Sequence, residues 1–456
     1  MSPKITVYTP SHNYGHYLAT AIESVLRQSM DSWELLLIDD GSTDDTAEVI
    51  SRYAGDARVR AFKTPGIGLH GVGNLAIREA RGDYIIRLDG DDIFEENILL
   101  VLSNYLDRHP AAALVFPDYF LIDDFGEVFA QERRQPVYAS NHMLDMPPHG
   151  AGTMFRKKVL EEVGGYQPEL GAQDGFYIWN KIAQSHKSAN VNAPLFYYRR
   201  HGDNLTNRFN HILEARRRIK KDHIATSLPQ HGPYCAIIPC RKNYDFCPDV
   251  WSRQIRGKTL LHYKIASCIK SSLLDHIVVA SDSEEVKEVI ASFDDPRVRF
   301  FAREPRETIR SETIVTTLEK IIDQFDPLRK GVSVLSYVQN PLVTTDTLEE
   351  AICTLILNEA DSSFGVQEIR SPLYKRASFG LQPLNPPVGF STDFDTVYCQ
   401  TNTFLATRNK NFSSGALMGP RVVNFVVSER ENLFINSEHT LQIAAVMMAQ
   451  RELFEA

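Results

Sequence analysis

The apolar and polar positions of the first half of the chain follow two alternating patterns. Short apolar runs rich in β-branched residues and bounded by turn residues predict buried strands. Stretches with apolar residues three and four apart predict helices between them. The predicted strands cover residues 4–9, 33–38, 59–62, 84–88 and 113–116. Because strands and helices alternate, we expect an α/β domain with a mostly parallel sheet.

The same rhythm begins again in the second half, with predicted strands at residues 235–239, 276–280, 298–301 and 332–337. A segment rich in Pro, Gly and Ser, residues 227–233, predicts a linker before it. We therefore predict two α/β domains in tandem. The first covers residues 1–208 and the second residues 234–456, with a basic helix and linker at residues 209–233 between them.

Length and charge narrow the class of protein. A chain of 456 residues is too long for one hydrophobic core. Its net charge of −9 argues against a nucleic-acid partner. The first residues carry no basic segment followed by an apolar core, and no apolar run reaches the length of a membrane span. These features predict a cytoplasmic location.

Three carboxylates, Asp89, Asp91 and Asp92, directly follow the strand at residues 84–88. Open α/β sheets bind ligands at the carboxyl ends of their strands. Closely spaced carboxylates suit Mg²⁺ or Mn²⁺, and such an ion typically also binds the phosphates of a substrate. The alternative is an acidic surface turn, because Asp-Gly is a common turn dipeptide.

Two further segments follow the second and third strands. Asp39 and Asp40 end the second strand, where they either bind a ligand or cap the following helix. Residues 66–71 fit G-x-G-x-x-G, but they follow the third strand and not the first. We interpret residues 66–73 as a flexible glycine-rich loop that approaches a ligand, with a helix from Asn74.

The ordered motifs of residues 4 to about 205 resemble a family-2 glycosyltransferase with the GT-A fold. The motifs are Thr9-Pro10-Ser11-His12-Asn13, Asp39-Asp40-Gly41-Ser42-Thr43-Asp44, Asp89-Gly90-Asp91-Asp92, residues 149–156 and 163–166, Gln173-Asp174 and Arg199-Arg200-His201. The resemblance implies inverting transfer of a sugar from a nucleotide-diphosphate sugar to a hydroxyl of a glycan or glycolipid, with Mg²⁺ or Mn²⁺ as cofactor.

The resemblance also implies a role for each motif residue. Asp91 and Asp92 would hold the metal, and Asp174 would be the base that activates the acceptor hydroxyl. The expected donor-binding residues are Pro10, Asp40 at the base, Asp89 at the ribose, and Arg199, Arg200 and His201 at the diphosphate. Two alternatives stay open, namely that Asp174 is a turn residue and that His201 is a surface-loop histidine.

Residues 236 to about 445 resemble the cytidylyltransferases that make CMP-activated nonulosonic or octulosonic acids. Matching segments include residues 237–241, 257–261 and 278–285. Asn243-Tyr244-Asp245 replaces the family's Gly-Ser-Lys loop, and Val250-Trp251 replaces its Lys-Asn pair. Residues 434–436 lack the carboxylates of its late D-x-D motif. We therefore expect a non-catalytic domain that, like much of this family, forms a homodimer.

Together the two resemblances give the predicted fold class: two nucleotide-diphospho-sugar-transferase-like mixed-sheet α/β domains in tandem, GT-A and Rossmann-like. The basic run from Arg216 to Lys221 predicts a solvated connecting helix or a surface for peripheral contact with anionic lipid or an acidic glycan. The predicted function is glycosyl transfer in surface polysaccharide synthesis. The alternatives are a bifunctional enzyme that also makes a CMP-activated acid sugar, and a non-catalytic scaffold that binds a nucleotide sugar.

Overall fold

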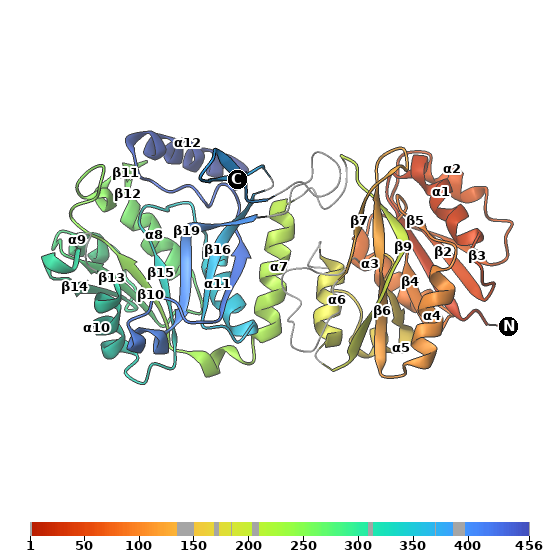
Figure 1. Cartoon of the computed structure of the whole chain (residues 1–456), viewed down its shortest axis with the longest axis horizontal. Coiled ribbons are helices and arrows are strands. Elements are labelled where there is room, and N and C mark those ends of the chain that lie inside the picture. Colours follow the sequence, from red (N-terminus) through yellow and green to blue (C-terminus); the bar gives the residue numbers. More distant parts are fainter. Residues whose placement is uncertain are drawn as a thin grey trace. The chain divides into compact units, whose positions relative to one another are not determined.

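The computed structural model divides the chain into two compact units, residues 1–216 and 217–456 (Figure 1). Each unit has its own sheet and its own hydrophobic core. No helix among the described residues combines the length and apolar character that a membrane crossing requires. The described residues are 2–134, 150–167, 173–183, 185–202, 209–308, 313–369, 371–385 and 397–455.

The sheet of the first unit has nine strands in the order β3-β2-β1-β4-β8-β6-β9-β5, with β7 paired to β6. Strands β1 to β4 are parallel, and β8 runs antiparallel to both β4 and β6. The sheet is therefore mixed, as predicted. The strands are β1 (Ile5–Ser11), β2 (Trp33–Asp40), β3 (Val59–Thr64), β4 (Tyr84–Arg87), β5 (Ile93–Phe94), β6 (Ala112–Ile122), β7 (Val128–Glu132), β8 (Met154–Arg156) and β9 (Lys187–Arg199).

Helices cover both faces of this sheet (Figure 1). The core on one face joins the sheet to α1 (Gly15–Leu26), α2 (Thr46–Ser51) and α4 (Ile98–Arg108). The core on the other face joins it to α3 (Gly68–Glu79), α5 (Lys157–Glu162) and α6 (Asp174–Ala183). Alternate residues of β2, such as Leu35 and Ile38, enter opposite cores because successive strand side chains point to opposite faces.

The glycine-rich segment is not the flexible loop that the sequence predicted. Helix α3 begins at Gly68, six positions before the predicted start at Asn74. The carboxylate of Asp40 accepts hydrogen bonds from the backbone N–H groups of Ile67 and Gly68, at 2.7 and 2.8 Å. A carboxylate at this position satisfies N–H groups that a helix start leaves without partners, and it also suits the helix dipole. This contact lets a glycine-rich segment begin a helix.

The second unit contains a seven-stranded sheet in the order β14-β13-β10-β15-β19-β16-β20. Strand β19 runs antiparallel to β15, and the four strands before it are parallel. The main elements are β10 (Tyr234–Pro239), α8 (Leu260–Ile269), β13 (His276–Ser281), α9 (Val286–Ala291), β14 (Val298–Ala302), α10 (Val315–Phe325), β15 (Val332–Ser336), α11 (Thr345–Leu357), β16 (Ser362–Ile369), β19 (Val397–Arg408), β20 (Val422–Val426) and α12 (Glu438–Glu455).

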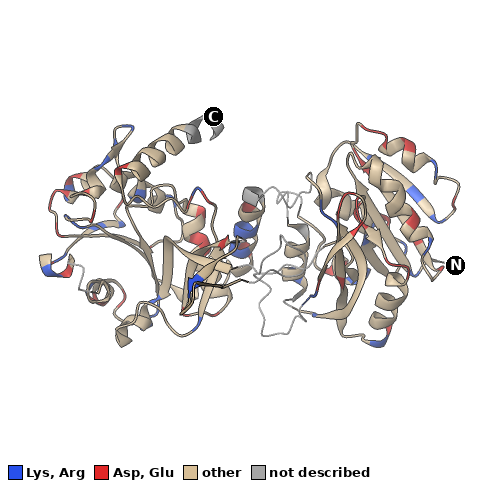
Figure 2. Cartoon of the chain, turned by 45° about the horizontal axis from the view of Figure 1, so that its top comes forward, with Lys and Arg blue, Asp and Glu red and all other residues tan. Residues whose placement is uncertain are grey.

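Helix α7 (Phe209–Ile224) carries the basic run, and three of its cations, Arg217, Lys220 and Lys221, form ion pairs with carboxylates of the second unit. Arg217 lies 2.8 Å from Glu350 and 3.1 Å from Glu431. Lys220 also lies 2.9 Å from Glu350. Figure 2 colours the ribbon of the chain by residue type, with Lys and Arg in blue and Asp and Glu in red. Because carboxylates bind Arg217 and Lys220, these two cations are not solvated, as one of the two interpretations had them. The contact of the run with anionic lipid or an acidic glycan stays a prediction.

Candidate functional site

The polar segments that follow β1, β2 and β4 meet at one edge of the first sheet. Strand β1 pairs in parallel with both β2 and β4, so the three carboxyl ends are neighbours. Pro10 lies near the end of β1, opposite Ile38 of β2. A Cβ atom added at Gly90 would lie 3.3 Å from the carbonyl oxygen of Pro10. The turn that carries the three aspartates therefore packs directly against the end of β1.

Asp91 and His201 form the centre of the site. His201 Nε2 lies 2.9 Å from Asp91 Oδ2, although 110 residues separate them along the chain. Both side chains are more than nine-tenths buried. The His201 ring also packs against Tyr14 and Tyr17, with centroids 5.7 and 5.5 Å apart. His201 is therefore fixed against Asp91, and the alternative that it is a surface-loop histidine is wrong.

Asp92 lies behind this pair and is only 1% exposed. Its Oδ1 accepts a hydrogen bond from the backbone N–H of Arg199 at 2.9 Å, whereas its Oδ2 has no hydrogen-bond partner among the described residues. Burial, followed by the charges of Asp91 and Asp89, raises the pKa of Asp92 well above its usual value. Positive charge beside these carboxylates would favour their ionised form.

Arg199 connects the aspartate turn to a second turn that follows β6. Its Nε donates to the carbonyl of Asp91 at 2.9 Å, and its Nη1 donates to the carbonyls of Asp123 and Asp124 at 2.8 and 3.1 Å. The guanidinium lies 4.6 Å from the ring centroid of Tyr17. Arg199 is 4% exposed, so its contacts hold the site together from inside.

Asp89 is oriented by Arg87, the last residue of β4. Arg87 Nε lies 2.9 Å from Asp89 Oδ1, and the Asp89 side chain remains 21% exposed. An arginine buried in an apolar strand requires a charged or polar partner, and here the partner is the residue predicted to contact the ribose.

Asp40 lies at the end of β2, where it shapes the neighbouring turn. In addition to the two N–H groups at the start of α3, its carboxylate accepts a hydrogen bond from Thr64 Oγ1 at 2.5 Å. His12 Nδ1 lies 2.8 Å from the carbonyl oxygen of Asp40. Asp40 thus fixes the turn between β3 and α3, and its capping partner is α3 and not the following helix α2.

The start of α2 is held by a different carboxylate. Asp44 accepts hydrogen bonds from the backbone N–H groups of Thr46 at 3.1 Å and Gly15 at 2.9 Å. Asp39 instead accepts from the N–H of Ser42 at 2.9 Å, within the turn itself. The alternative that Asp39 or Asp40 caps α2 is therefore wrong.

Two predicted site residues are not brought to the Asp91–His201 pair by any described contact. Arg200 is exposed, and its N–H donates to the carbonyl of Ile122 at 2.9 Å. Asp174 is the first residue of α6, and its side chain lies outside the described part of the structure. Its role as the base remains a prediction.

Some residues of this site could hold a divalent cation together with substrate phosphates and water. Within the described ranges no three His, Cys, Asp or Glu side chains form a group that could hold a metal ion. Mg²⁺ sites of this kind use one or two carboxylates together with substrate phosphates and water, and thus need no all-protein cage. Asp91 supplies a carboxylate oxygen and His201 a ring nitrogen, and the two atoms lie 2.9 Å apart. Asp92 adds a buried oxygen that has no hydrogen-bond partner among the described residues. Asp91 and His201 could therefore hold the ion, with Asp92 behind them.

Sequence reasoning missed two residues of this site. The role of Arg87 could have been inferred from the sequence, because Arg87 is a charged residue within the buried run at residues 84–88. The role of Tyr17 could not have been inferred from the sequence, because an aromatic residue in an amphipathic helix usually belongs to the core. Here Tyr17 lies under Arg199 and donates to Asp124 Oδ1 at 3.0 Å.

In the corresponding loop of the second unit, side chains of the loop contact one another. After β10, Tyr244 packs against Arg241 at 5.0 Å and accepts a hydrogen bond from its backbone N–H. The Arg241 guanidinium lies 3.9 Å from Asp245. Ile435 is fully buried, and its N–H donates to the carbonyl of Gln339 at 2.7 Å. The segment that corresponds to the phosphate loop thus carries Tyr244, packed against Arg241. The segment that corresponds to D-x-D carries the buried aliphatic side chain of Ile435.

Each half of the chain matches a known protein family. Residues 6–164 match the family described as glycosyl transferase family 2, and residues 236–379 match the family described as cytidylyltransferase. Chondroitin synthase of Escherichia coli is 25% identical over 205 residues, which are 45% of this chain and 30% of that protein. Hyaluronan synthase of Pasteurella multocida is 26% identical over 206 residues, 45% of this chain and 21% of that protein.

A solved structure, Staphylococcus aureus TarS 1–349 in complex with UDP, aligns with a TM-score of 0.41 and 16% identity over 49% of this chain and 65% of that chain. The chain spans less than a third of the length of the two synthases.

These matches define the class. The first half contains a family-2 glycosyltransferase domain, and the second half contains a cytidylyltransferase-like domain. Both family resemblances and the predicted fold class are confirmed, and the first half carries the predicted glycosyltransferase domain.

Proposed function

We propose that the first unit transfers a sugar from a nucleotide-diphosphate sugar to a hydroxyl of a glycan or glycoconjugate, with inversion and with a divalent metal ion, in the synthesis of a surface polysaccharide. The observation that carries this proposal is the contact between Asp91 and His201 at the carboxyl edge of the sheet. The names of the two synthase relatives support a polysaccharide product.

The residues of the site have separate tasks in this reaction. Asp40 and Asp89 lie at the carboxyl ends of β2 and β4, the strands on either side of β1, where they would orient the base and the ribose of the donor. Asp91 and His201 would hold the metal ion, which supplies positive charge against the departing diphosphate. Arg199 fixes the Asp91 backbone so that this geometry exists before the donor binds. Asp174 would accept the proton of the acceptor hydroxyl.

A panel of UDP-, GDP-, dTDP- and CMP-sugars tests this proposal and identifies the donor. The proposal requires release of a nucleoside diphosphate by the full chain from at least one of the first three donors. Release of CMP alone, from CMP-sugars only, would contradict it.

We propose that the second unit does not transfer a cytidylyl group. The packing of Tyr244 and Asp245 around Arg241 supports this proposal, because a triphosphate would require open positive charge at that loop. Formation of a CMP-sugar from CTP and an acid sugar would instead establish the bifunctional alternative.

We also propose that the second unit forms a homodimer. Strands β17 (Tyr374–Arg376) and β18 (Leu381–Pro383) pair only with each other among the described residues. An isolated two-stranded hairpin is marginally stable in water. It exposes large apolar side chains, with Phe379 95%, Leu381 69% and Tyr374 55% exposed. A second copy of the chain would cover them. The cytoplasmic location stays a prediction.

A further inference from the structure

Tyr17 of α1 contacts the site residues and not the hydrophobic core. Among the described residues, the core clusters of the first unit contain Leu18 and Ile22 of this helix but not Tyr17. The centroid of the Tyr17 ring lies 5.5 Å from that of the His201 ring and 4.6 Å from the Arg199 guanidinium. An aromatic side chain placed in this way does not serve core packing, so its contacts with the site require an explanation.

The contacts of Tyr17 complete a closed ring of interactions around the site. The Tyr17 hydroxyl donates to Asp124 Oδ1 at 3.0 Å, and the carbonyl of Asp124 accepts from Arg199 Nη1 at 3.1 Å. Arg199 Nε donates to the carbonyl of Asp91 at 2.9 Å. Asp91 Oδ2 lies 2.9 Å from His201 Nε2, and the His201 ring packs against Tyr17. Both residues that could hold the metal ion are therefore members of this ring.

The turn that accepts the Tyr17 hydrogen bond is itself fixed by polar contacts. Asp123 Oδ1 accepts hydrogen bonds from the N–H groups of Phe125 and Glu127, both at 2.9 Å. Strand β6, which precedes the turn, pairs with β9 as far as Ile122 and Arg199. The turn thus holds one conformation next to the strand end that carries Arg199.

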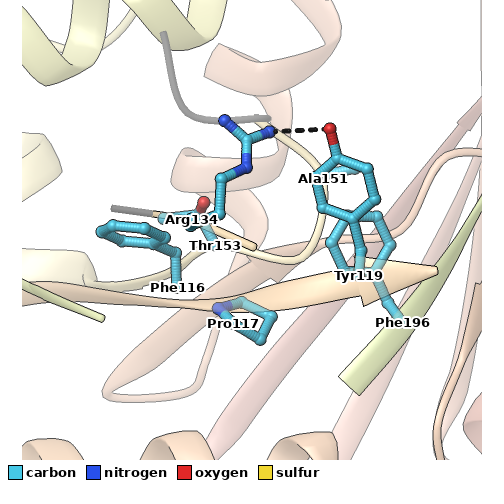
Figure 3. A pocket seen from close by; sticks show the side chains of 7 residues that line it. All are labelled: Phe116, Pro117, Tyr119, Arg134, Ala151, Thr153 and Phe196. Atoms are coloured by element: carbon cyan, nitrogen blue, oxygen red, sulfur yellow. Dashed lines mark hydrogen bonds between the residues drawn. The ribbon is translucent and has the colours of Figure 1, made fainter. Parts of the chain in front are cut away.

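Aromatic packing also holds the strands on either side of this turn (Figure 3). The ring centroid of Tyr119, in β6, lies 5.0 Å from that of Phe196, in β9. Arg134, which follows β7, donates from Nη2 to the Tyr119 hydroxyl at 3.2 Å. A residue that orients a site must itself be held by packing and hydrogen bonds. The turn after β6 meets this requirement as a support for Tyr17.

We propose that Tyr17 is a positioning residue of the metal site, whose ring holds the His201 imidazole and whose hydroxyl ties α1 to the turn after β6. This role rests on the metal-dependent transfer proposed above. Tyr17 acts through His201 and Arg199, which keep the Asp91 carboxylate and the imidazole in place before the ion and the diphosphate arrive. Residues that orient metal ligands contribute to metal affinity nearly as directly as the ligands themselves.

The test measures Mn²⁺ binding to the full chain in the presence of UDP, GDP or dTDP, from the electron paramagnetic resonance signal of free Mn²⁺. Tyr17→Leu removes the ring and the hydroxyl and should raise the Kd for Mn²⁺ about tenfold to a hundredfold, the usual effect of losing an outer contact of a metal ligand. Tyr17→Phe keeps the ring and should raise the Kd about twofold to tenfold, the usual effect of losing one hydrogen bond.

Tyr105→Leu is the matched control. Tyr105 also packs against a histidine ring, that of His109, with centroids 4.1 Å apart, but it does so on α4. This variant should leave the Kd for Mn²⁺ unchanged. Urea unfolding shows whether each variant is folded, and if Tyr17→Leu does not fold, Tyr17→Phe alone decides.

The rate of nucleoside diphosphate release gives a second reading. Tyr17→Leu should release it more slowly at low Mn²⁺, and higher Mn²⁺ should restore the rate. A Kd for Mn²⁺ that stays unchanged in both Tyr17 variants, or that rises equally in Tyr105→Leu, would overturn the proposal, as would a rate that saturating Mn²⁺ does not restore. An unaltered chain that binds Mn²⁺ with none of the three diphosphates would instead refute the proposed metal dependence itself.

Discussion

Asp40 shows how one carboxylate can organise a binding edge. It accepts three hydrogen bonds, from Thr64, Ile67 and Gly68, and it is only 7% exposed. The turn after β2 closely approaches the turn after β3, because a Cβ atom added at Gly41 would lie 3.0 Å from the N atom of Gly66. Gly41 also has a φ of +76°, which glycine adopts without strain. The donor-side turns are thus set by buried polar contacts.

Replacing Asp40 with Asn should destabilise the chain. The amide retains one acceptor oxygen, but its NH₂ group would face a buried backbone N–H, which costs about 1–3 kcal/mol. We expect a lower free energy of unfolding in urea and weaker donor binding. Asp45→Asn is the matched control, because Asp45 is exposed and its side chain makes no capping hydrogen bond. Equal stability of the two variants would show that the Asp40 contacts do not hold this turn.

At the residue scale, the sequence predicted the cluster of aspartates but not the residues that contact them. Asp89, Asp91 and Asp92 are neighbours along the chain, and their position after a buried strand indicated a ligand site. The partners of Asp92 and Asp91 are Arg199 at the end of β9 and His201 just after it, more than a hundred positions later in the chain. No local pattern predicts that Arg199 is buried while Arg200 is exposed, because that depends on which face of β9 packs against α1. The early start of α3 was missed because its cap, Asp40, lies 28 positions before Gly68.

Helix α7 is the element whose environment differs most from its sequence pattern. Its cations face Glu349 and Glu350 of α11, together with Glu431. Charge patterning alone indicated a basic surface, because the acidic partners lie 128 or more positions away. Removing one partner of such a buried ion pair strongly destabilises the folded chain, because the other charge stays buried without a counter-charge.

Replacing Arg217 with Ala should destabilise the second unit by about 3–5 kcal/mol, because it leaves Glu431 buried without its cation and leaves Glu350 with Lys220 alone. The free energy of unfolding measured in urea checks this expectation. Glu214→Ala, at an exposed position on the same helix, is the control. If the two variants are equally stable, the ion pairs do not anchor α7.

The same network predicts a pH dependence. Burial of Glu431 opposes its ionisation, but the charge of Arg217 and hydrogen bonds from Thr347 and Arg217 outweigh burial and hold its pKa below the usual value. The network's contribution is therefore complete above the unfolded pKa of about 4.3 and is lost as pH falls through the lower folded pKa. Thermal unfolding of the unaltered chain from pH 6 to pH 3 should show this loss. Glu431→Gln should reduce the slope, and an unchanged slope would contradict the assignment.

At the scale of the whole molecule, the first unit carries the proposed donor site, and the second unit has a cytidylyltransferase-like fold that we propose to be non-catalytic. The sequence predicted both folds because their apolar runs repeat with clear strand and helix periods. It did not predict the hairpin of β17 and β18, whose apolar side chains are exposed and follow no buried pattern.

If that hairpin forms the interface between two chains, placing negatively charged side chains on it should dissociate the dimer. Phe379→Asp with Leu381→Asp should convert a dimer into a monomer in sedimentation velocity, because two carboxylates would be desolvated in the interface. Val128→Asp, at an exposed position in the first unit, should leave the dimer intact. A monomer at all concentrations for the unaltered chain would contradict the homodimer.

The most direct test of the central claim is release of nucleoside diphosphate from the preferred donor with Mn²⁺, with Mg²⁺ and with chelator, for the unaltered chain and for Asp91→Asn and His201→Ala. We expect metal-dependent release that chelator abolishes. Asp91→Asn should reduce it at least about a hundredfold, the scale of losing one electrostatic contact to the transition state. His201→Ala should raise the metal concentration for half-maximal rate. Release that persists with chelator and in Asp91→Asn would contradict the assignment of this site.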